Sequence, residues 1–439
     1  MTTTFVPTWY AIDFGTSNSL LAAANAEGIH APVPLDPLAS DPTILRSVLF
    51  FPNADRCYFG LSAIAQYVEG GMHGRLIRSV KKHLPSRSFI GTSIDDRPMS
   101  IEDLIGAMLR EMRARANRFF GADVRRVVLG RPARFSDEPA DDLFAEQRLE
   151  RAARLAGFEE VRFLAEPVAA AREYRRLAAS SPLIGQRAVT GSLALVADFG
   201  GGTSDFTILR LEAGELRAAD VLAIGGVGVA GDALDAGLMR TKVARHFGAD
   251  VVYRVPFGSN EMRMPPALME RLSSPADLSI LRRQEVMTFL RNIRSWSLGP
   301  EDTEKIDQLF TLIEDGLGFH VFEAIERAKR QLSHDDACTL TFEYPTIEIR
   351  EPITRNEFEQ ASERALTRIL DRLEETLAAA ELSASEIDVV CCTGGTAKVP
   401  VLARAIAAKF PQARIEEFKS FHSIVEGLAL HAQELAARA

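Results

Sequence analysis

Two stretches of the sequence decide the fold: residues 11–19, AIDFGTSNS, and residues 195–209, LVADFGGGTSDFTIL. In each of them a compact apolar run, typical of a buried strand, ends in Asp-Phe-Gly, and a Thr-Ser pair and a second apolar run follow. The simplest structure for this pattern is a strand, a tight polar turn and a returning strand. The sequence therefore predicts the same hairpin twice, and residues 388–402 place a third glycine turn after an apolar run.

Helical periodicity fills the chain between these stretches. Apolar residues recur three and four positions apart in the segments 101–120, 141–156, 232–247, 319–332 and 356–380. Strand-like runs alternate with these segments at residues 124–129, 161–164 and 221–224. This alternation predicts an α/β fold with mixed sheets.

The segment 251–317 differs from the rest of the chain. Prolines interrupt it, and only two short helical stretches are expected, at residues 278–296 and 303–315. We interpret the segment as an inserted helical subdomain. A glycine-containing stretch at residues 185–191, between a helix and the second predicted hairpin, is the candidate boundary between two lobes.

Composition and charge exclude several classes of protein. Fifty-one basic and sixty acidic side chains give a net charge of −9, so no global positive field favours nucleic acid or anionic lipid. Uninterrupted apolar runs of about 18 residues do not occur, which predicts a cytoplasmic chain without membrane spans. The four cysteines form no C-x-x-C motif, which favours reduced, buried thiols over a zinc site.

The two predicted turns have the composition of phosphate-binding loops. Their glycines let the backbone approach a phosphate closely, the amides point inward, and the neighbouring hydroxyls add donors. These residues are Gly15, Thr16, Ser17 and Asn18 in the first turn, and Gly200, Gly201, Gly202, Thr203 and Ser204 in the second. Asp13 and Asp198 end the preceding strands, where they would hold a hard cation through water. Two such turns facing each other would grip one polyphosphate from both sides.

Three other motifs point to different chemistry. Residues 226–231 match G-x-G-x-x-G after a strand-like run, with Asp250 where a ribose acid would stand, which suggests a dinucleotide fold. That interpretation leaves both Asp-Phe-Gly hairpins without a role. The Asp-Phe-Gly tripeptides lack the other protein-kinase motifs. His334-Asp335-Asp336 follows a helix without a partner histidine, so a polar turn is expected there rather than a metal site.

Taken together, these stretches resemble the actin-like ATPases and, within them, the DnaK-type heat-shock chaperones. Residues 11–19 and 195–209 are similar to the two phosphate hairpins of that family. Residues 164–171 are similar to its N-E-P-T-A-A-A stretch. Residues 326–333, ERAKRQLS, resemble its adenine-binding helix, and residues 393–400 resemble the turn under the adenosine.

The resemblance runs along almost the whole chain, with the segment after Val251 as the main addition. It implies an α/β, two-lobed actin-like ATPase fold, built from duplicated ribonuclease-H-like mixed sheets with flanking helices and a nucleotide in the interlobe cleft. Lobe I is expected at residues 1–190 with a subdomain at about 30–120. Lobe II is expected at 191–439, with an inserted subdomain at about 232–318 and a closing helix at about 424–439. The resemblance further implies a nucleotide-binding domain without the family's peptide-binding domain, similar to short YegD-like homologues.

The function implied by the resemblance is magnesium-dependent binding and hydrolysis of ATP by a chaperone-type ATPase. ATP or ADP, Mg²⁺ and K⁺ would be the ligands. The implied catalytic residues are Lys81, Glu166, Asp198, Thr203 and Asp205, and Asp13, Glu166 and Asp198 would hold the metal mostly through water. Lys81 would orient the attacking water and offset charge on the γ-phosphate, and Asp205 would serve as base. Besides the two turns, the implied nucleotide-binding residues are Gly231, Glu326, Lys329, Arg330, Ser333, Gly394, Gly395, Thr396 and Lys398.

Departures from the family's pattern leave other functions open. The residues after Lys81 and Lys82 differ from the family's L-I-G-R, and residues 130–135 read GRPARF where the family has V-P-A-Y-F. One alternative is a small-molecule kinase of the same superfamily, and another is a nucleotide-gated scaffold protein that hydrolyses nothing. A protein partner or co-chaperone is expected beside ATP, with no nucleic acid and no membrane, and the sequence does not indicate an oligomeric state.

Overall fold

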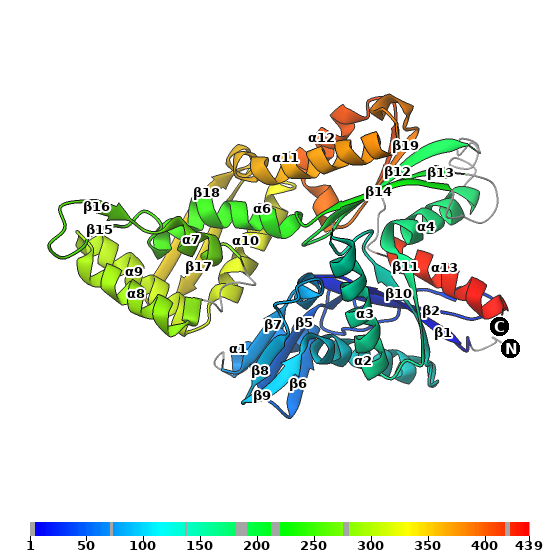
Figure 1. The fold of residues 1–439 in the computed structure, drawn as a ribbon, viewed down its shortest axis with the longest axis horizontal. Helices are drawn as coiled ribbons and strands as arrows, with labels where there is room; N and C mark the ends of the chain where they lie inside the picture. The colour runs from blue at the N-terminus through cyan, green and yellow to red at the C-terminus, as the bar shows by residue number, and fades with distance from the viewer. Residues whose placement is uncertain are drawn as a thin grey trace. The chain divides into compact units, whose positions relative to one another are not determined.

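A computed structural model describes residues 5–70, 73–136, 138–180, 191–211, 220–274, 281–417 and 422–438 (Figure 1). The chain forms two compact units. Unit 1 contains Met1–Gly228, Ile369–Ala397 and Leu402–Ala439, and unit 2 contains Val229–Arg368 and Lys398–Val401. The expected lobe boundary at 185–191 lies almost wholly outside the described residues, so the predicted division at residue 190 stays a prediction.

Unit 1 contains most of the strands. Its strands are β1 (Trp9–Phe14), β2 (Asn18–Ala24), β3 (Ile29–His30), β4 (Leu45–Arg46), β5 (Val48–Asn53), β6 (Arg56–Phe59), β7 (Arg75–Arg78), β8 (Gly91–Ile94), β9 (Arg97–Ser100), β10 (Arg126–Arg131), β11 (Glu160–Ala165), β12 (Ser192–Phe199), β13 (Ser204–Leu211), β14 (Val221–Val227), β19 (Val389–Thr393) and β20 (Arg414–Glu417). Its helices are α1 (Gly60–Glu69), η1 (Val80–His83), α2 (Ile101–Phe120), α3 (Pro139–Leu155), α4 (Glu166–Ser180), η6 (Ala384–Glu386) and α13 (Ser423–Arg438). Three helices have residues in both units: α11 (Arg355–Ala379), η7 (Gly395–Lys398) and α12 (Pro400–Lys409).

The two large sheets of unit 1 repeat one topology. In the first sheet, β11, β10 and β1 run parallel, and β2 and β3 continue antiparallel. In the second sheet, β20, β19 and β12 run parallel, and β13 and β14 continue antiparallel. The helices follow the same order, because α2, α3 and α4 alternate with β10 and β11 as α11, α12 and α13 alternate with β19 and β20. The predicted duplication and the α/β actin-like fold class are confirmed.

Alternating side chains of β1 divide the core of unit 1. Tyr10, Ile12 and Phe14 are fully buried in one cluster with α2 and α3. Trp9 and Ala11 point to the other face, where they pack in a cluster with strands of the second sheet and with α4 and α13. Helices α4 and α13 lie side by side (Figure 1). A Cβ on Gly427 of α13 would lie 1.8 Å from the carbonyl oxygen of Ala169 on α4. The closing helix can approach α4 this closely only because it carries glycine there.

Local signals in the sequence set both ends of helix α2. The α2 helix occupies the predicted residues 101–120, since Ser100 and Asp103 form a capping box and Gly121 ends the helix at a φ of 64°. Between β4 and α2, a small sheet with strand order β6-β5-β7, the helix α1 and the β8–β9 hairpin occupy much of the expected 30–120 subdomain.

Unit 2 is mainly helical. Its elements are α6 (Gly231–Leu238), η3 (Met239–Val243), η4 (Ala244–Phe247), β15 (Val252–Arg254), β16 (Glu261–Arg263), α7 (Pro266–Leu272), α8 (Gln284–Trp296), α9 (Pro300–Glu314), α10 (Gly318–Leu332), β17 (Ala337–Tyr344) and β18 (Ile347–Thr354). Pro266 and Pro300 start helices α7 and α9 instead of interrupting them, because the first helical position needs no amide donor.

Two parts of unit 2 differ from the prediction. The segment 251–317 contains a third helix, α7, beside the two that were expected. The expected helix 232–247 is an α-helix only to Leu238 and then continues as a π-turn and a 3-10 turn. The hydroxyl of Thr241 donates to the carbonyl of Gly237, and Gly248 ends the segment at a φ of 82°. Apolar periodicity does not reveal this change, because the π and 3-10 segments are each only about one turn long.

The dinucleotide interpretation of residues 226–231 is wrong. The motif does join β14 to α6, but β14 lies at the edge of its sheet and pairs antiparallel with β13. A dinucleotide motif requires a parallel βαβ unit at this point.

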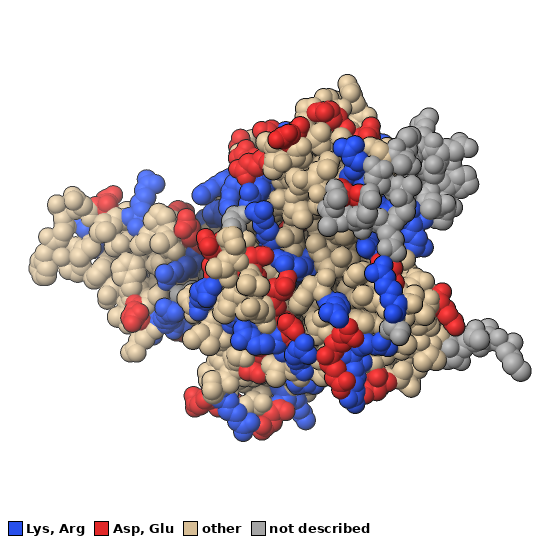
Figure 2. Space-filling view, turned by 45° about the vertical axis from the view of Figure 1, so that its right-hand side comes forward, with Lys and Arg blue, Asp and Glu red and all other residues tan. Residues whose placement is uncertain are grey.

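The surface carries both signs of charge. Figure 2 shows basic and acidic side chains interspersed over the visible face, so the net charge of −9 does not gather into one patch there. Among the described helices, none is long and apolar enough to cross a membrane.

Candidate functional site

The two predicted hairpins are present and their turns have equal length. Phe14 pairs with Ser19 across β1 and β2, and Phe199 pairs with Ser204 across β12 and β13, which leaves four residues in each turn. All eight turn residues are half-buried, so each turn keeps part of its surface accessible to a ligand. The turns stand at the carboxyl ends of β1 and β12, the side of α/β sheets where ligands bind.

Close contacts explain why glycine occurs in these turns. A Cβ on Gly15 would lie 2.2 Å from the carbonyl oxygen of Asn18, so only glycine fits. A Cβ on Gly202 would lie 3.3 Å from the side-chain methyl carbon of Thr16. This second contact shows that the two turns approach each other directly, as the sequence predicted for a pair of phosphate-binding loops.

Neighbouring hydroxyls hold each turn in place. The Ser47 hydroxyl donates to the carbonyl of Gly15 over 2.7 Å, and the Ser47 amide donates to the carbonyl of Ser17 over 2.9 Å. In the second turn the Thr396 hydroxyl donates to the carbonyl of Gly200 over 2.7 Å. Gly394, with a φ of 88°, packs against Phe199, where a Cβ would meet the carbonyl oxygen at 2.2 Å. Thr396 and Gly394 thus lie behind the second turn and support it.

Five ionisable side chains are buried beside the turns. They are Asp13, Lys81, Glu166, Asp198 and Asp205, with exposed fractions between 1% and 9%. Lys81 Nζ donates to Glu166 Oε1 over 2.7 Å, whereas the side chain of the adjacent Lys82 is exposed. Of the two neighbouring lysines, the structure brings Lys81 into the cluster, the one that the sequence analysis selected.

The charges in this cluster do not balance. Four carboxyl groups face one ammonium group, all out of water. Burial, and next the charge of Glu166, raise the pKa of Asp198 to about 8 and that of Asp205 to about 7, and they raise the pKa of Asp13 well above its usual range. Burial alone would lower the pKa of Lys81, but the charges of Glu166 and Asp13 together raise it. The cluster therefore favours additional positive charge, from protons or from a cation.

Direct metal ligation is not built into the described residues. Among them, no three His, Cys, Asp or Glu side chains converge closely enough to hold a metal ion. A cation attracted by these carboxylates would keep its own water ligands, as Mg²⁺ usually does.

One oxygen of Asp205 has no hydrogen-bond partner among the described residues. Burial is the main cause of the raised pKa of Asp205, and hydrogen bonding to Thr203 and to the backbone of Ala133 offsets part of this rise. Its Oδ2 atom is buried without a hydrogen-bond partner among the described residues. An unsatisfied buried acceptor costs free energy, so its presence indicates a missing donor such as a water molecule.

The other expected nucleotide-binding residues belong mainly to unit 2. Lys329 on α10 donates to Asp235 Oδ2 over 2.7 Å and to the carbonyl of Gly231 over 3.4 Å, which ties α10 to the start of α6. Burial above all raises the pKa of Asp235 to about 6. The hydroxyl of Ser333, just past α10, donates to the carbonyl of Lys329. Glu326 on α10 is half-buried and Arg330 is exposed, and Lys398 also belongs to unit 2, while Gly395 lies with Gly394 in unit 1.

Sequence reasoning missed three contributors to the site. Ser47 holds the first turn, the Ala133 amide contacts Asp205, and Gly130 leaves space for Glu166, since a Cβ there would lie 3.1 Å from Glu166 Cγ. Ser47 is a small polar residue in a short buried run and belongs to no motif. A backbone amide gives no signal in side-chain chemistry. For Gly130 a signal existed, since the glycine precedes a proline loop at the end of a predicted strand.

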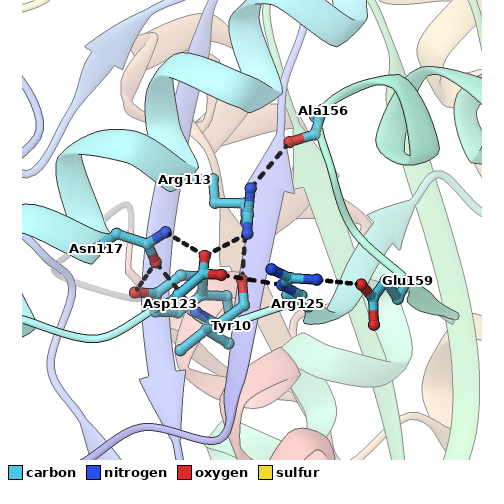
Figure 3. A network of polar contacts seen from close by, with 8 residues as sticks. Tyr10, Arg113, Asn117, Asp123, Arg125, Ala156 and Glu159 are labelled. Carbon is cyan, nitrogen blue, oxygen red and sulfur yellow. Dashed lines mark hydrogen bonds and ion pairs between the residues drawn. The ribbon is translucent and has the colours of Figure 1, made fainter.

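A second polar cluster occupies the opposite end of the first sheet (Figure 3). Tyr10 near the start of β1 donates to Asn117 Oδ1 over 2.9 Å, and Asp123 accepts from Arg113 and Arg125. Arg125 also pairs with Glu159. Two acids face two arginines here, and most of these side chains are partly exposed.

Comparison with known proteins supplies the family. A model of the Hsp70 protein matches residues 72–250 and 318–438, more than half of the chain. The chain belongs to the Hsp70 family. The match omits residues 251–317, the segment singled out above as the main addition to the family's pattern.

Several curated Hsp70 relatives match along 97% of the chain. The chain is 22% identical over 431 residues to a chaperone protein DnaK of Thermosipho melanesiensis. It is 24% identical over 425 residues to those of Thermotoga neapolitana and Thermotoga maritima. It spans 59% of the length of each of these relatives.

Proposed function

We propose that this Hsp70-family chain binds ATP at its two paired turns and hydrolyses it, as a chaperone-type ATPase. One observation carries the proposal: two matching glycine turns meet beside a buried cluster of four acids and one lysine. The family membership and the relatives named chaperone protein DnaK support it.

The residues of the cluster fit a polyphosphate with a hydrated magnesium ion. Backbone amides of both turns and the hydroxyls of Thr16 and Thr203 would bind phosphate oxygens. Asp13, Glu166 and Asp198 would hold the hydrated ion through its water ligands. The crowded negative charges of these three residues would attract such a cation. When bound, Mg²⁺ neutralises charge on the phosphates. The binding of K⁺, the assignment of individual residues to the metal and the nucleotide-binding roles of the residues in unit 2 stay predictions.

Two side chains would carry the reaction. Lys81 presents its ammonium group beside the turns, where it would orient the attacking water and offset the charge that develops on the transferred phosphoryl group. Asp205 would accept a hydrogen bond from that water at Oδ2 and take its proton. Its raised pKa of about 7 suits a general base near neutral pH.

Single-turnover release of phosphate from ATP tests this assignment. We expect turnover that requires Mg²⁺, and a fall of about 10²-fold to 10³-fold in Lys81→Ala and in the Lys81→Ala, Asp205→Ala double variant. Lys82→Ala is the matched control, because this exposed neighbour should leave the rate unchanged. A double variant as fast as the wild type would refute the catalytic roles.

The same assay separates the alternatives. Acceleration of ADP formation by a sugar or a carboxylate would indicate a small-molecule kinase. Tight ATP binding without turnover would indicate a nucleotide-gated scaffold. We further propose that a partner protein or co-chaperone reads the nucleotide state of the chain in the cytoplasm; retention of ATP but not ADP complexes by such a partner would support this role.

A further inference from the structure

The segment 84–90 connects η1, the turn that carries Lys81, to β8. It reads Leu-Pro-Ser-Arg-Ser-Phe-Ile and forms only turns, without a strand or a helix. On its other side η1 follows Ser79, which has a φ of 53°, in the left-handed region that residues other than glycine rarely adopt. A backbone of this kind keeps its shape only when its surroundings determine it. Contacts from outside the segment are therefore needed to hold η1.

Arg148 on helix α3 supplies such contacts. Its side chain is 4% exposed, and its guanidinium lies among the backbone carbonyl groups of the segment 84–90. Nη1 donates to the carbonyls of Leu84 and Ser86, over 3.3 and 3.1 Å. Nη2 donates to the carbonyls of Phe89 and Ile90, over 3.0 and 3.5 Å. One side chain thus contacts both ends of the segment.

Only an arginine can make this arrangement. Burying a charged group costs free energy unless its donors are satisfied. The four carbonyl groups, together with Glu102, which accepts from Nε over 3.1 Å, provide one acceptor for each of the five guanidinium N–H groups. A lysine presents three donors at a single point, so it could not reach both ends of the segment at once. Arg148 therefore fixes the segment in one shape.

Two contacts join the segment to η1. The amide of Leu84 donates to the carbonyl of Lys81 over 3.1 Å. The ring of His83, the last residue of η1, stacks on the ring of Phe89, with the ring centres 4.3 Å apart. Leu84 and Phe89 are also two of the residues whose carbonyls accept from Arg148. The place of η1 therefore depends on the place of this guanidinium.

We infer that Arg148 is a positioning residue, which acts through the segment 84–90 to hold the ammonium group of Lys81 beside the two glycine turns. The catalytic consequence rests on the proposed function, whereas the positioning rests on the contacts alone. Among the described residues, Arg148 makes no hydrogen bond or ion pair with the two turns or with the buried acids of the site.

Trace acetylation of the nucleotide-free protein with acetic anhydride tests the positioning. The side chain of Lys81 is 8% exposed and paired with Glu166, so it should react slowly, whereas the exposed Lys82 should react as a surface lysine. Arg148→Gln should speed acetylation of Lys81 several-fold and leave that of Lys82 unchanged. Arg148→Lys keeps the buried charge but cannot span the segment, so it should act in the same direction with a smaller effect.

The lysine variant keeps the test decisive if Arg148→Gln does not fold. An unchanged acetylation rate at Lys81 in Arg148→Lys would then refute the inference, as would unchanged rates in both variants. Mass spectrometry of the peptide that contains both lysines measures the two rates in the same sample, so Lys82 serves as the internal standard.

Arg113→Lys is the matched control. Arg113 on α2 also donates to backbone carbonyl groups, those of Val124 over 2.8 Å and Ala156 over 3.4 Å, and its side chain is 16% exposed. It belongs to the polar cluster at the other end of the sheet (Figure 3), so its replacement should not release η1. Equal acceleration at Lys81 in Arg113→Lys and Arg148→Lys would indicate a general loosening of unit 1 and would overturn the inference.

Kinetics of ATP turnover test the catalytic consequence. A misplaced catalytic group slows the chemical step without weakening substrate binding, so kcat of Arg148→Lys should fall about tenfold with KM for ATP unchanged. Arg113→Lys should change neither value. An equal fall in both variants, or a rise in KM as large as the fall in kcat, would contradict the positioning role. If even the wild type does not hydrolyse ATP, the proposed function fails, and the acetylation result still decides whether Arg148 positions Lys81.

Discussion

Strand β1 carries a polar cluster near each end, and the two clusters contrast in charge and burial. At the amino end, two arginines face Asp123 and Glu159, and the acids are 55% and 67% exposed (Figure 3). At the carboxyl end, four acids face one lysine, Lys81, among the described residues, and none of the five is more than 9% exposed. The pKa of Asp123 is lowered, chiefly by its hydrogen bond from Arg125, whereas the pKa of Asp198 is raised to about 8, chiefly by burial.

This contrast distinguishes a structural network from the proposed binding site. Partners of opposite charge satisfy each acid at the amino end, so the network is complete as it stands. At the carboxyl end the same sheet buries a surplus of negative charge, which destabilises the protein until a cation or proton arrives. Strained, uncompensated polar groups are typical of functional sites.

The largest effect should be a fall in stability with rising pH. The pKa values of Asp13, Asp198 and Asp205 are higher in the folded protein than in the unfolded chain. At these three groups the folded state then holds more protons, so the stability that they contribute is fully present below their pKa in the unfolded chain and is lost as pH rises through about 7 and 8. We expect the urea midpoint of the nucleotide-free protein to fall from pH 5.5 to 8.5. The pKa of Asp123 is lowered, so its contribution to stability is lost only as pH falls below the usual pKa of an aspartate, which lies outside the range from pH 5.5 to 8.5.

Variants test whether the candidate site causes this change of the urea midpoint with pH. Burial also raises the pKa of Asp235 to about 6 and that of Glu426 to about 7, so both contribute in part of the same range. Asp198→Asn should flatten the slope relative to the wild type, and Mg²⁺ with ADP should flatten it as well. An Asp198→Asn slope identical to the wild type would mean that the site is not the origin.

One chemical change should have opposite effects in the two clusters. At pH 8, Asp198→Asn removes a repelled charge and should stabilise the nucleotide-free protein by about 1–2 kcal/mol, although it impairs turnover. Asp123→Asn removes a charge that two arginines attract and should lower the urea midpoint. Equal signs for the two variants would contradict the comparison.

The sequence alone predicted the parts of the site that local chemistry encodes. Each glycine turn follows an apolar strand and precedes another, so the two hairpins and their duplication could be derived from residues 11–19 and 195–209. The need for glycine at position 15 is also local, because any larger residue would collide with the backbone of Asn18 in the same turn.

Parts that depend on long-range contacts could not be predicted in the same way. Ser47 supports the first turn from more than thirty residues away, and Ala133 contributes through its amide. The change from α to π and 3-10 turns after Leu238 could not be predicted either, since each of these segments is too short to show a different apolar spacing.

The smallest effect should come from the complete network at the amino end. Tyr10 is fully buried, and its hydroxyl donates to Asn117 Oδ1. In Tyr10→Phe that acceptor keeps the amide of Val124 as a second donor, at 3.3 Å, so no buried group loses its last partner. We expect a loss of about 0.5–1 kcal/mol in the free energy of unfolding and no change in ATP turnover. A loss of several kcal/mol, or any change in kcat, would show that the two ends of β1 are energetically coupled and that the network does more than fix α2 to the sheet.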